Sequence, residues 1–292
     1  MSGSHTAALS QVATVEAPAL AAKVRADARR ATMNALGSSL LTFALTIVTV
    51  LVLWQGTLSL FGVSAYVAKG PADVWTFLVS APDAAANRAE LFGQLGETLG
   101  DAAIGFVAGL IVALLVAMLF QLSKGAEQAL MPLAMLLRSV PLVAMAPVII
   151  LIFQRSFVTV AVIGGIVVLF PALVNIVFGV RSSSPLMNDV IAVYGGSAWT
   201  ALRKVALPNA LPSLLAAVRI SVPGAITGAL LAEWLAVGGG IGGSVGAYQA
   251  QAQFSALWTA VVLVTAAALV IYNIVAVVES IVLARMGMAD RS

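Results

Sequence analysis

About six long apolar runs nearly fill this sequence, and they constrain its fold more than any other feature. They occupy residues 38–62, 98–121, 130–153, 157–180, 213–236 and 255–284. A helix that crosses the hydrocarbon core of a bilayer needs about 20 apolar residues, and each run reaches that length. We therefore predict an all-α membrane protein with about six transmembrane helices.

The composition agrees with this class, since 61% of the residues are hydrophobic and 9% are charged. The mean hydropathy is +1.05, well above that of ordinary globular domains. The run at 38–62 is too long for the core of a signal peptide and lacks a convincing cleavage site. We expect it to be a retained first helix.

The side chains offer little for catalysis. The chain has no cysteine, and its single histidine, His5, lies in a polar tail. It has neither a Ser/His/Asp set nor a close pair of carboxylates on one face, and its glycine-rich stretch GGGIGGSVG lacks the lysine of a phosphate-binding loop. An intrinsic active site is not expected, and any ATP hydrolysis must take place on another subunit.

Basic residues indicate the orientation, because Lys and Arg flanks stay in the cytoplasm. Six spans place both termini on one side, which we predict to be cytoplasmic. The loops on the other side hold only Lys69, Arg88 and Arg155. The predicted cytoplasmic side holds Lys23, Arg25, Arg29, Arg30, Lys124, Arg181, Arg203, Lys204, Arg219, Arg285 and Arg291. The pI of about 9.5 therefore reflects topology, and no nucleic-acid partner is expected.

The segment 181–212 is a polar interruption between two apolar runs. Asn188 or Asp189 could cap a short helix that Gly195 or Gly196 would end. A second short helix would begin at Ser197, carry an apolar stripe of Trp199, Leu202 and Val205 beside the off-stripe Arg203 and Lys204, and stop at Pro208. Asn209 could cap the next membrane helix, with Pro212 in its first turn. Amphipathicity alone leaves open whether the stripe rests on lipid headgroups or on a protein.

This segment resembles the cytoplasmic loop of ABC-importer permeases, whose signature is Glu-Ala-Ala, three residues, Gly, nine residues, then Ile, any residue and Leu-Pro. Aligned on Leu207-Pro208, the sequence has Val205 for the Ile and Gly195 at the required place, thirteen positions before Pro208. The departure is Asp189-Val190-Ile191 in place of Glu-Ala-Ala.

The resemblance extends over about 90–285 and is strongest to the nitrate/sulfonate/taurine branch. ETLGDAAIGFVAGLIVALLVAML looks like the second span of that branch, LMPLAMLLRSVPLVAMAPVIILIF like its third and GALLAEWLAVGGGIGG like its fifth. The resemblance implies a type I importer permease fold in a bacterial inner membrane. It also implies that 189–208 forms a coupling helix that docks on a cytoplasmic ATPase.

Partners follow from the same resemblance: two ATP-binding subunits that carry ATP and Mg, a second permease copy, an extracytoplasmic substrate-binding protein and the lipid bilayer. No cofactor is expected on this chain, and a homodimer is the simpler pairing. We divide the chain into a cytoplasmic tail, a first helix with an outer segment, a core permease domain containing the loop 181–212, and a C-terminal tail, at 1–35, 36–97, 98–285 and 286–292.

Ionisable groups inside membrane helices usually face a cavity or a partner. We expect Arg138 or Glu233 either to line the translocation path, with Ser139, Pro141 and Met145 as further candidates, or to serve a structural role. An arginine on the path would suit an anionic solute. Glu279 is expected to be interfacial, and the glycines at 239–243 either form an outer turn or gate or allow close packing.

Two other functions were weighed against the importer. A self-sufficient secondary transporter should show inverted repeats and midplane carboxylates, and the sequence has no convincing internal repeat. A non-transport membrane scaffold would not need a loop of this pattern. Nitrate, sulfonates, taurine and pyrimidine-like precursors all stay open as substrates, because a separate binding protein selects the solute in this family.

Overall fold

The computed structural model describes residues 45–288, and every regular element there is helical. The chain divides into two compact units, Met1–Pro71 and Ala72–Ser292, which we describe separately. In the described part of the first unit, Leu45–Leu60 forms an apolar helix. The expected N-terminal tail and the start of the expected first span lie outside the described residues, as does the end of the C-terminal tail.

The second unit contains long helices that match the predicted spans. Within the described residues, four helices are long and apolar enough to cross a membrane: α3 (Ala84–Leu122), α6 (Phe157–Arg181), α10 (Leu211–Ala232, continued to Val237) and α12 (Phe254–Arg285). The second span begins at Ala84 rather than at 98, so the last part of the predicted outer segment belongs to α3. These helices confirm an all-α membrane protein.

The run at 130–153 is broken, contrary to the prediction of one span. It forms α4 (Lys124–Ser139) and α5 (Leu142–Phe153), bent by 104°. Val140 adopts an extended conformation and Pro141 precedes the first residue of α5. A residue before proline is driven out of the helical region, so Pro141 explains the break. Counted as one bent span, the pair raises the number of spans to five.

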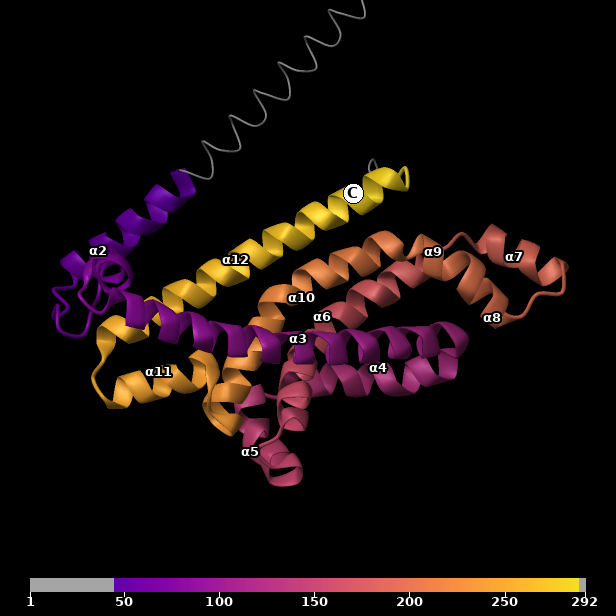
Figure 1. Cartoon of the computed structure of the whole chain (residues 1–292). Coiled ribbons are helices and arrows are strands. Elements are labelled where there is room, and N and C mark those ends of the chain that lie inside the picture. The colour runs from indigo at the N-terminus through magenta and orange to yellow at the C-terminus, as the bar shows by residue number, and fades with distance from the viewer. Residues whose placement is uncertain (1–44, 289–292) are drawn as a thin grey trace, which may run out of the picture. The chain divides into compact units, whose positions relative to one another are not determined.

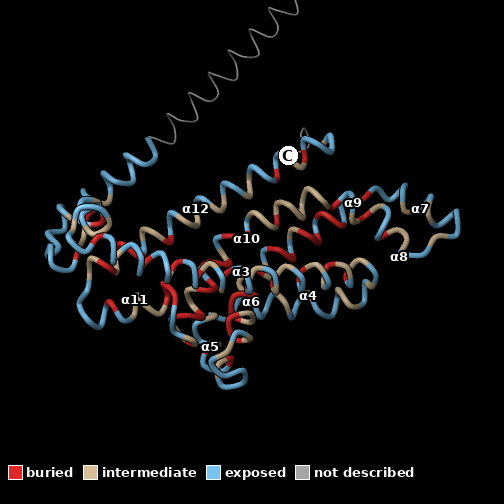
Figure 2. The backbone as a smooth tube through the Cα atoms, viewed as in Figure 1, coloured by how far each residue is buried: buried red, intermediate tan, exposed pale blue. Residues whose placement is uncertain are grey.

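Helices α3, α6 and α10 form the centre of this unit, where buried residues gather in Figure 2. They meet at glycines. A Cβ added at Gly105 would lie 2.8 Å from the Cα of Gly164, and one added at Gly228 would lie 2.7 Å from the same atom. Small residues allow membrane helices to approach this closely, so Gly164 is the point where the three helices touch.

Short helices complete the unit at its two ends (Figure 1). One end carries α7 (Pro185–Val193), α8 (Ala198–Ala201) and α9 (Leu207–Asn209), which project beyond α6 and α10. At the other end, α11 (Gly240–Ala250) lies along the first part of α3. There α2 (Pro71–Trp75) and the π-helical turn Thr76–Ser80 precede α3, and the side-chain amide of Asn87 donates to the carbonyl oxygen of Phe77 at 3.1 Å.

Candidate functional site

Helix α7 opens the polar segment between α6 and α10. It begins at Pro185 after Ser184, so the predicted start at Asn188 or Asp189 is wrong. Proline suits the first turn of a helix because the N–H that it lacks would have no partner there, which accounts for the earlier start. The predicted break at Gly195 is confirmed, because this residue has φ +75°, a conformation that glycine adopts without strain.

The second half of the segment, α8 to α9, is one nearly continuous helical stretch. Ser197 caps it as predicted, accepting a hydrogen bond from the backbone N–H of Thr200 at 3.3 Å. The predicted stop at Pro208 is wrong, since helix continues to Asn209 and Ala210 precedes α10 in place of the predicted Asn209 cap. A π-helical turn at Leu202–Ala206 precedes the proline. Its wider backbone can relieve the clash that proline makes with the preceding turn.

Helical position separates the predicted docking residues into two groups. Leu202 is 1% exposed and packs with Ala206 among side chains of α3 and α6, so its prediction as an anchor for a partner is wrong. Trp199 is 51% exposed. Of the other predicted residues, Val205 and Leu207 are half-buried, whereas the exposed ones are Asp189, Gly195, Arg203, Lys204 and Pro208. The segment is therefore fixed to the bundle by one side only.

Residues that the sequence analysis missed dominate the free side. Val193 and Tyr194 are 84% and 87% exposed, and Leu186 and Val190 are exposed as well. We call Leu186, Val190, Val193, Tyr194 and Trp199 the loop patch. The sequence contained a signal for this patch, namely the apolar residues just before Gly195. A short helix that ends in a turn cannot bury them.

The broken span forms a second candidate site. A cavity of about 360 Å³ lies beside the bend and is lined by Arg138, Ser139 and Pro141 together with Phe170 and Pro171. The Ser139 hydroxyl donates to the carbonyl oxygen of Leu136 at 2.7 Å. Within residues 45–288, no carboxylate forms an ion pair with Arg138. This cavity combines a free positive charge with an interrupted membrane helix.

Two residues predicted for the same path lie elsewhere. Met145 is partly buried and packs against the buried cluster between α5 and α6, and its place on the path stays a prediction. Glu233 is 1% exposed and does not line the Arg138 cavity. Its carboxylate is enclosed by other groups, and its place on the translocation path stays a prediction.

Those groups cap the first turn of α11. The Oε2 atom of Glu233 accepts hydrogen bonds from the N–H of Gly242 at 2.7 Å and from the Thr98 hydroxyl at 2.9 Å. The Thr98 oxygen accepts from the N–H of Ile241 at 2.8 Å, and Glu97 accepts from the N–H of Gly240 at 2.7 Å. The first amides of a helix need such acceptors. We call these four hydrogen bonds the α11 knot.

The glycines around the knot form a turn, as one of the alternatives expected. The φ angles of Gly238, Gly239 and Gly240 are +72°, +73° and +54°. A Cβ at Gly240 would lie 2.3 Å from the carboxyl carbon of Glu233. The turn thus needs glycine both for its backbone conformation and for room beside the carboxylate.

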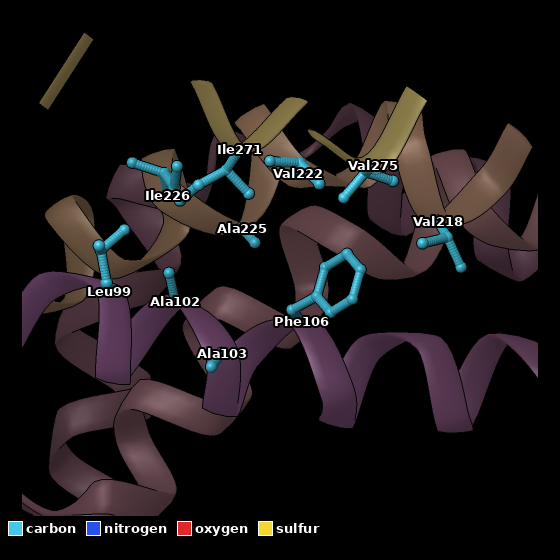
Figure 3. A pocket seen from close by; sticks show the side chains of 10 residues that line it. All are labelled: Leu99, Ala102, Ala103, Phe106, Val218, Val222, Ala225, Ile226, Ile271 and Val275. Carbon is cyan, nitrogen blue, oxygen red and sulfur yellow. The ribbon is translucent and has the colours of Figure 1, made fainter. Parts of the chain in front are cut away.

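A second cavity, of about 240 Å³, lies between α3, α10 and α12 (Figure 3). All of its labelled side chains are hydrocarbon, among them Phe106 and Ile271. Such a lining cannot orient a polar solute, so we do not assign it to the path. Near it, Glu279 is buried and pairs with Arg219, with Nε and Oε2 3.2 Å apart. The expectation that Glu279 lies near the membrane boundary stays a prediction.

A family model for the inner membrane component of binding-protein-dependent transport systems matches residues 105–287. The chain belongs to this family. It is therefore a non-catalytic, multi-pass component of an inner membrane. The match includes the α7–α9 segment, the Arg138 cavity and Glu233.

Curated relatives agree on this family and differ in what they transport. The chain is 30% identical over 169 residues to the riboflavin transport system permease protein RibX of Chloroflexus aurantiacus, covering 56% of this chain and 60% of the relative. It is 31% identical over 121 residues to a putative aliphatic sulfonates transport permease protein of Bacillus subtilis, covering 41% and 44%. The chain thus matches about 60% or less of the length of these relatives.

Solved structures confirm the type I importer permease fold. An amino acid ABC transporter matches with a TM-score of 0.52 and 16% identity, over 69% of this chain and 96% of the matched chain. The methionine ABC transporter MetNI matches with a TM-score of 0.51 and 19% identity, over 71% and 99%. At such identities the likeness concerns the fold.

Proposed function

We propose that this permease forms the translocation path for a small solute delivered by a binding protein, and that the α7–α9 segment couples it to a separate ATP-binding subunit. The observation that carries the proposal is the loop patch. Five large apolar side chains stand exposed at the end of the unit where this segment projects. Large apolar side chains that stand exposed together on one short polar segment are typical of a contact site.

The patch has the composition of a protein interface. Tyr194 and Trp199 are aromatic residues of the type that dominates binding energy. Asp189, Arg203 and Lys204 are exposed and supply a charged rim. Leu202 holds the segment to α3 and α6, so a push on the patch would be transmitted to the membrane helices. These features favour a protein partner over lipid headgroups.

We infer the number of permease copies in the complex from the number of contacts that two ATP-binding subunits need. One chain carries one patch, so two ATP-binding subunits imply two permease copies, most simply a homodimer. ATP and Mg would be bound by the ATP-binding subunits, and a binding protein would dock on the opposite side of the membrane. The proposed division of the chain keeps the tail 1–35, the first helix and outer segment 36–97, the core 98–285 and the C-terminal tail 286–292.

We further propose that the solute carries a negative charge and passes Arg138. The cavity at the bend of α4 and α5 offers the Arg138 guanidinium next to the Ser139 hydroxyl, and an arginine suits carboxylate, sulfonate or phosphate groups. The sulfonate relative supports this class and the nitrate/sulfonate/taurine branch, whereas the riboflavin relative favours a larger aromatic solute.

Isolation of the intact complex tests the assembly. We expect two copies of this permease, two ATP-binding subunits and one binding protein when the complex is weighed by native mass spectrometry. A complex with a single permease copy would contradict the proposal, and a second, different permease chain would change the homodimer to a heterodimer.

Uptake into proteoliposomes tests the path. Arg138→Ala should reduce uptake of the solute held by the binding protein by at least tenfold, while ATP-binding subunits still copurify. Arg155→Ala is the matched control, because Arg155 is exposed and does not line the cavity. Equal uptake by both variants would show that Arg138 does not contact the solute.

A further inference from the structure

Arg219 and Glu279 form an ion pair within the membrane-spanning helices α10 and α12. The side chains are 36% and 11% exposed, and Nε lies 3.2 Å from Oε2. The Cζ atom of Arg219 also lies 5.9 Å from the centroid of the Tyr272 ring, within the range of a cation–π contact. Both polar contacts therefore join α10 to the same helix, α12.

The pair lies in the part of α12 where few residues are fully buried. In the first part of α12, Ala256, Thr259, Ala260 and Val264 are buried; after Val264, only Glu279 and Leu283 are. The apolar cavity occupies the intervening stretch. Ile271 and Val275 of α12 face it, as do Val218 and Val222 of α10 (Figure 3). The second half of α12 thus packs with partly buried side chains beside an unfilled cavity, and the ion pair lies next to Val218.

Geometry suggests that the pair is not locked. Neither Nε of Arg219 nor Oε2 of Glu279 has an aligned hydrogen bond within residues 45–288, although the two atoms are close. Buried charges in a static structure normally satisfy their hydrogen bonds. An ion pair without them, beside a cavity, can change its geometry without losing its attraction.

The α7–α9 segment leads directly into this region. Only Ala210 separates α9 from α10, and Arg219 lies two turns into α10. A displacement of the loop patch would therefore move the first turns of α10. Arg219 is the charged side chain on that stretch that reaches another membrane helix.

We propose that the Arg219–Glu279 ion pair makes α12 follow α10 when the ATP-binding subunit displaces the loop patch, with the apolar cavity providing the space for that movement. The two residues are positioning residues for the coupling between ATP hydrolysis and transport. This inference rests on the proposed function of the α7–α9 segment as the contact with the ATP-binding subunit.

An apolar replacement separates this role from simple stabilisation. Exchanging a buried ion pair for apolar residues of similar size is often neutral or stabilising. The double variant Arg219→Met, Glu279→Leu should therefore retain its thermal unfolding temperature and copurify with the ATP-binding subunit. We expect its uptake into proteoliposomes to fall at least tenfold while ATP hydrolysis continues. Wild-type uptake by this variant would overturn the inference.

The reversed pair is the matched control. Arg219→Glu with Glu279→Arg keeps the attraction and should recover at least half of the wild-type uptake. A reversed pair that folds and binds the ATP-binding subunit but transports no better than the apolar pair would contradict a role for the attraction. Failure of the wild-type chain to bind the subunit would instead refute the proposed function.

Spin labels measure the movement without altering the ion pair. The chain has no cysteine, so Val107→Cys on α3 and Ile274→Cys on α12, both exposed and outside the cavity lining, introduce the sole labelling sites within one chain and report the movement of α12 relative to α3. A companion unlabelled copy keeps the measurement intramolecular. We expect the distance distribution between the labels to change between nucleotide-free and ATP-bound complexes in proteoliposomes. Identical distributions in a transport-competent complex would overturn the inference.

Discussion

The two ends of the second unit are built in opposite ways. At the α11 end, the carboxylates of Glu97 and Glu233, a hydroxyl and three backbone amides form the α11 knot, in which Glu233 is 1% exposed. At the α7–α9 end, the segment is held by buried aliphatic side chains such as Leu202, and Tyr194 is 87% exposed. One end binds the first amides of its helix through internal acceptors, whereas the other leaves apolar groups without cover in the single chain.

This difference indicates which end is completed by a partner. Hydrogen bonds in a buried site are directional, so the α11 knot fixes one arrangement of α3, the glycine turn and α11. Apolar contacts are non-directional, and an exposed apolar patch gains free energy when another surface covers it. We therefore expect substitutions at the α11 end to affect folding, and substitutions in the loop patch to affect assembly.

The largest loss of thermal stability should come from Glu233→Ala. Its loss leaves the Thr98 hydroxyl and the N–H of Gly242 buried without their acceptor, at a cost of about 1–3 kcal/mol for each group. We expect a lower thermal unfolding temperature of the purified chain in detergent. Glu233→Gln keeps one acceptor oxygen and should lose much less. Equal unfolding temperatures for Glu233→Ala and the wild type would show that the knot does not hold this end.

Leu202→Ala and Trp199→Ala form a pair that sharpens the contrast within one segment. Truncation of a buried leucine costs about 2–5 kcal/mol, so Leu202→Ala should lower the unfolding temperature. Trp199→Ala should leave it unchanged and weaken copurification of the ATP-binding subunit, by about 2 kcal/mol in binding free energy. The opposite pattern, with Trp199→Ala unfolding early, would contradict the assignment of the two sides.

Gly195→Val should have a smaller effect. The φ angle of +75° disfavours β-branched side chains by about 1–2 kcal/mol, although no atom lies within 4 Å of the space that a Cβ would occupy. The change should therefore alter the direction of α7. It should reduce the permease's stimulation of ATP hydrolysis by the ATP-binding subunit more than it lowers the unfolding temperature. Gly195→Asn is the control, since asparagine tolerates this region better. Equal stimulation in both variants and the wild type would refute the need for this turn.

The smallest effect is expected at the ion pair of Arg181 with Glu127, which joins α6 to α4. Arg181 is exposed, and exposed ion pairs contribute about 0–1 kcal/mol. Arg181→Gln should shift the unfolding temperature by about 2 °C or less, as measured by scanning fluorimetry. A shift as large as that of Leu202→Ala would show that charges, rather than aliphatic contacts, hold this end together.

Much of the fold could be predicted from the sequence, because membrane spans depend on local hydropathy. The apolar runs locate α3, α6, α10 and α12. The helix cap at Ser197 and the positive φ at Gly195 follow from local residue preferences. The bend at Pro141 was missed, since the apolar run continues through it without a change in composition.

The site was predicted less completely, because tertiary contacts decide which of its residues are buried and which are exposed. Trp199 and Leu202 share one helical stripe in the sequence, yet only Leu202 meets α3 and α6. The enclosure of the Glu233 carboxylate depends on Thr98, far away in the chain, and on the first turn of α11. No periodicity in one sequence identifies these partners.

Photo-cross-linking from the loop patch tests the central claim most directly. A photoreactive amino acid at Tyr194 should cross-link in membranes to a protein that carries an ATP-binding phosphate loop, whereas the same amino acid at Leu151, which is 83% exposed on α5, should not. The identity of the product follows from mass spectrometry of the cross-linked peptides. Cross-links from Tyr194 to lipid alone, in a complex that transports its solute, would contradict the assignment of the α7–α9 segment as the coupling contact.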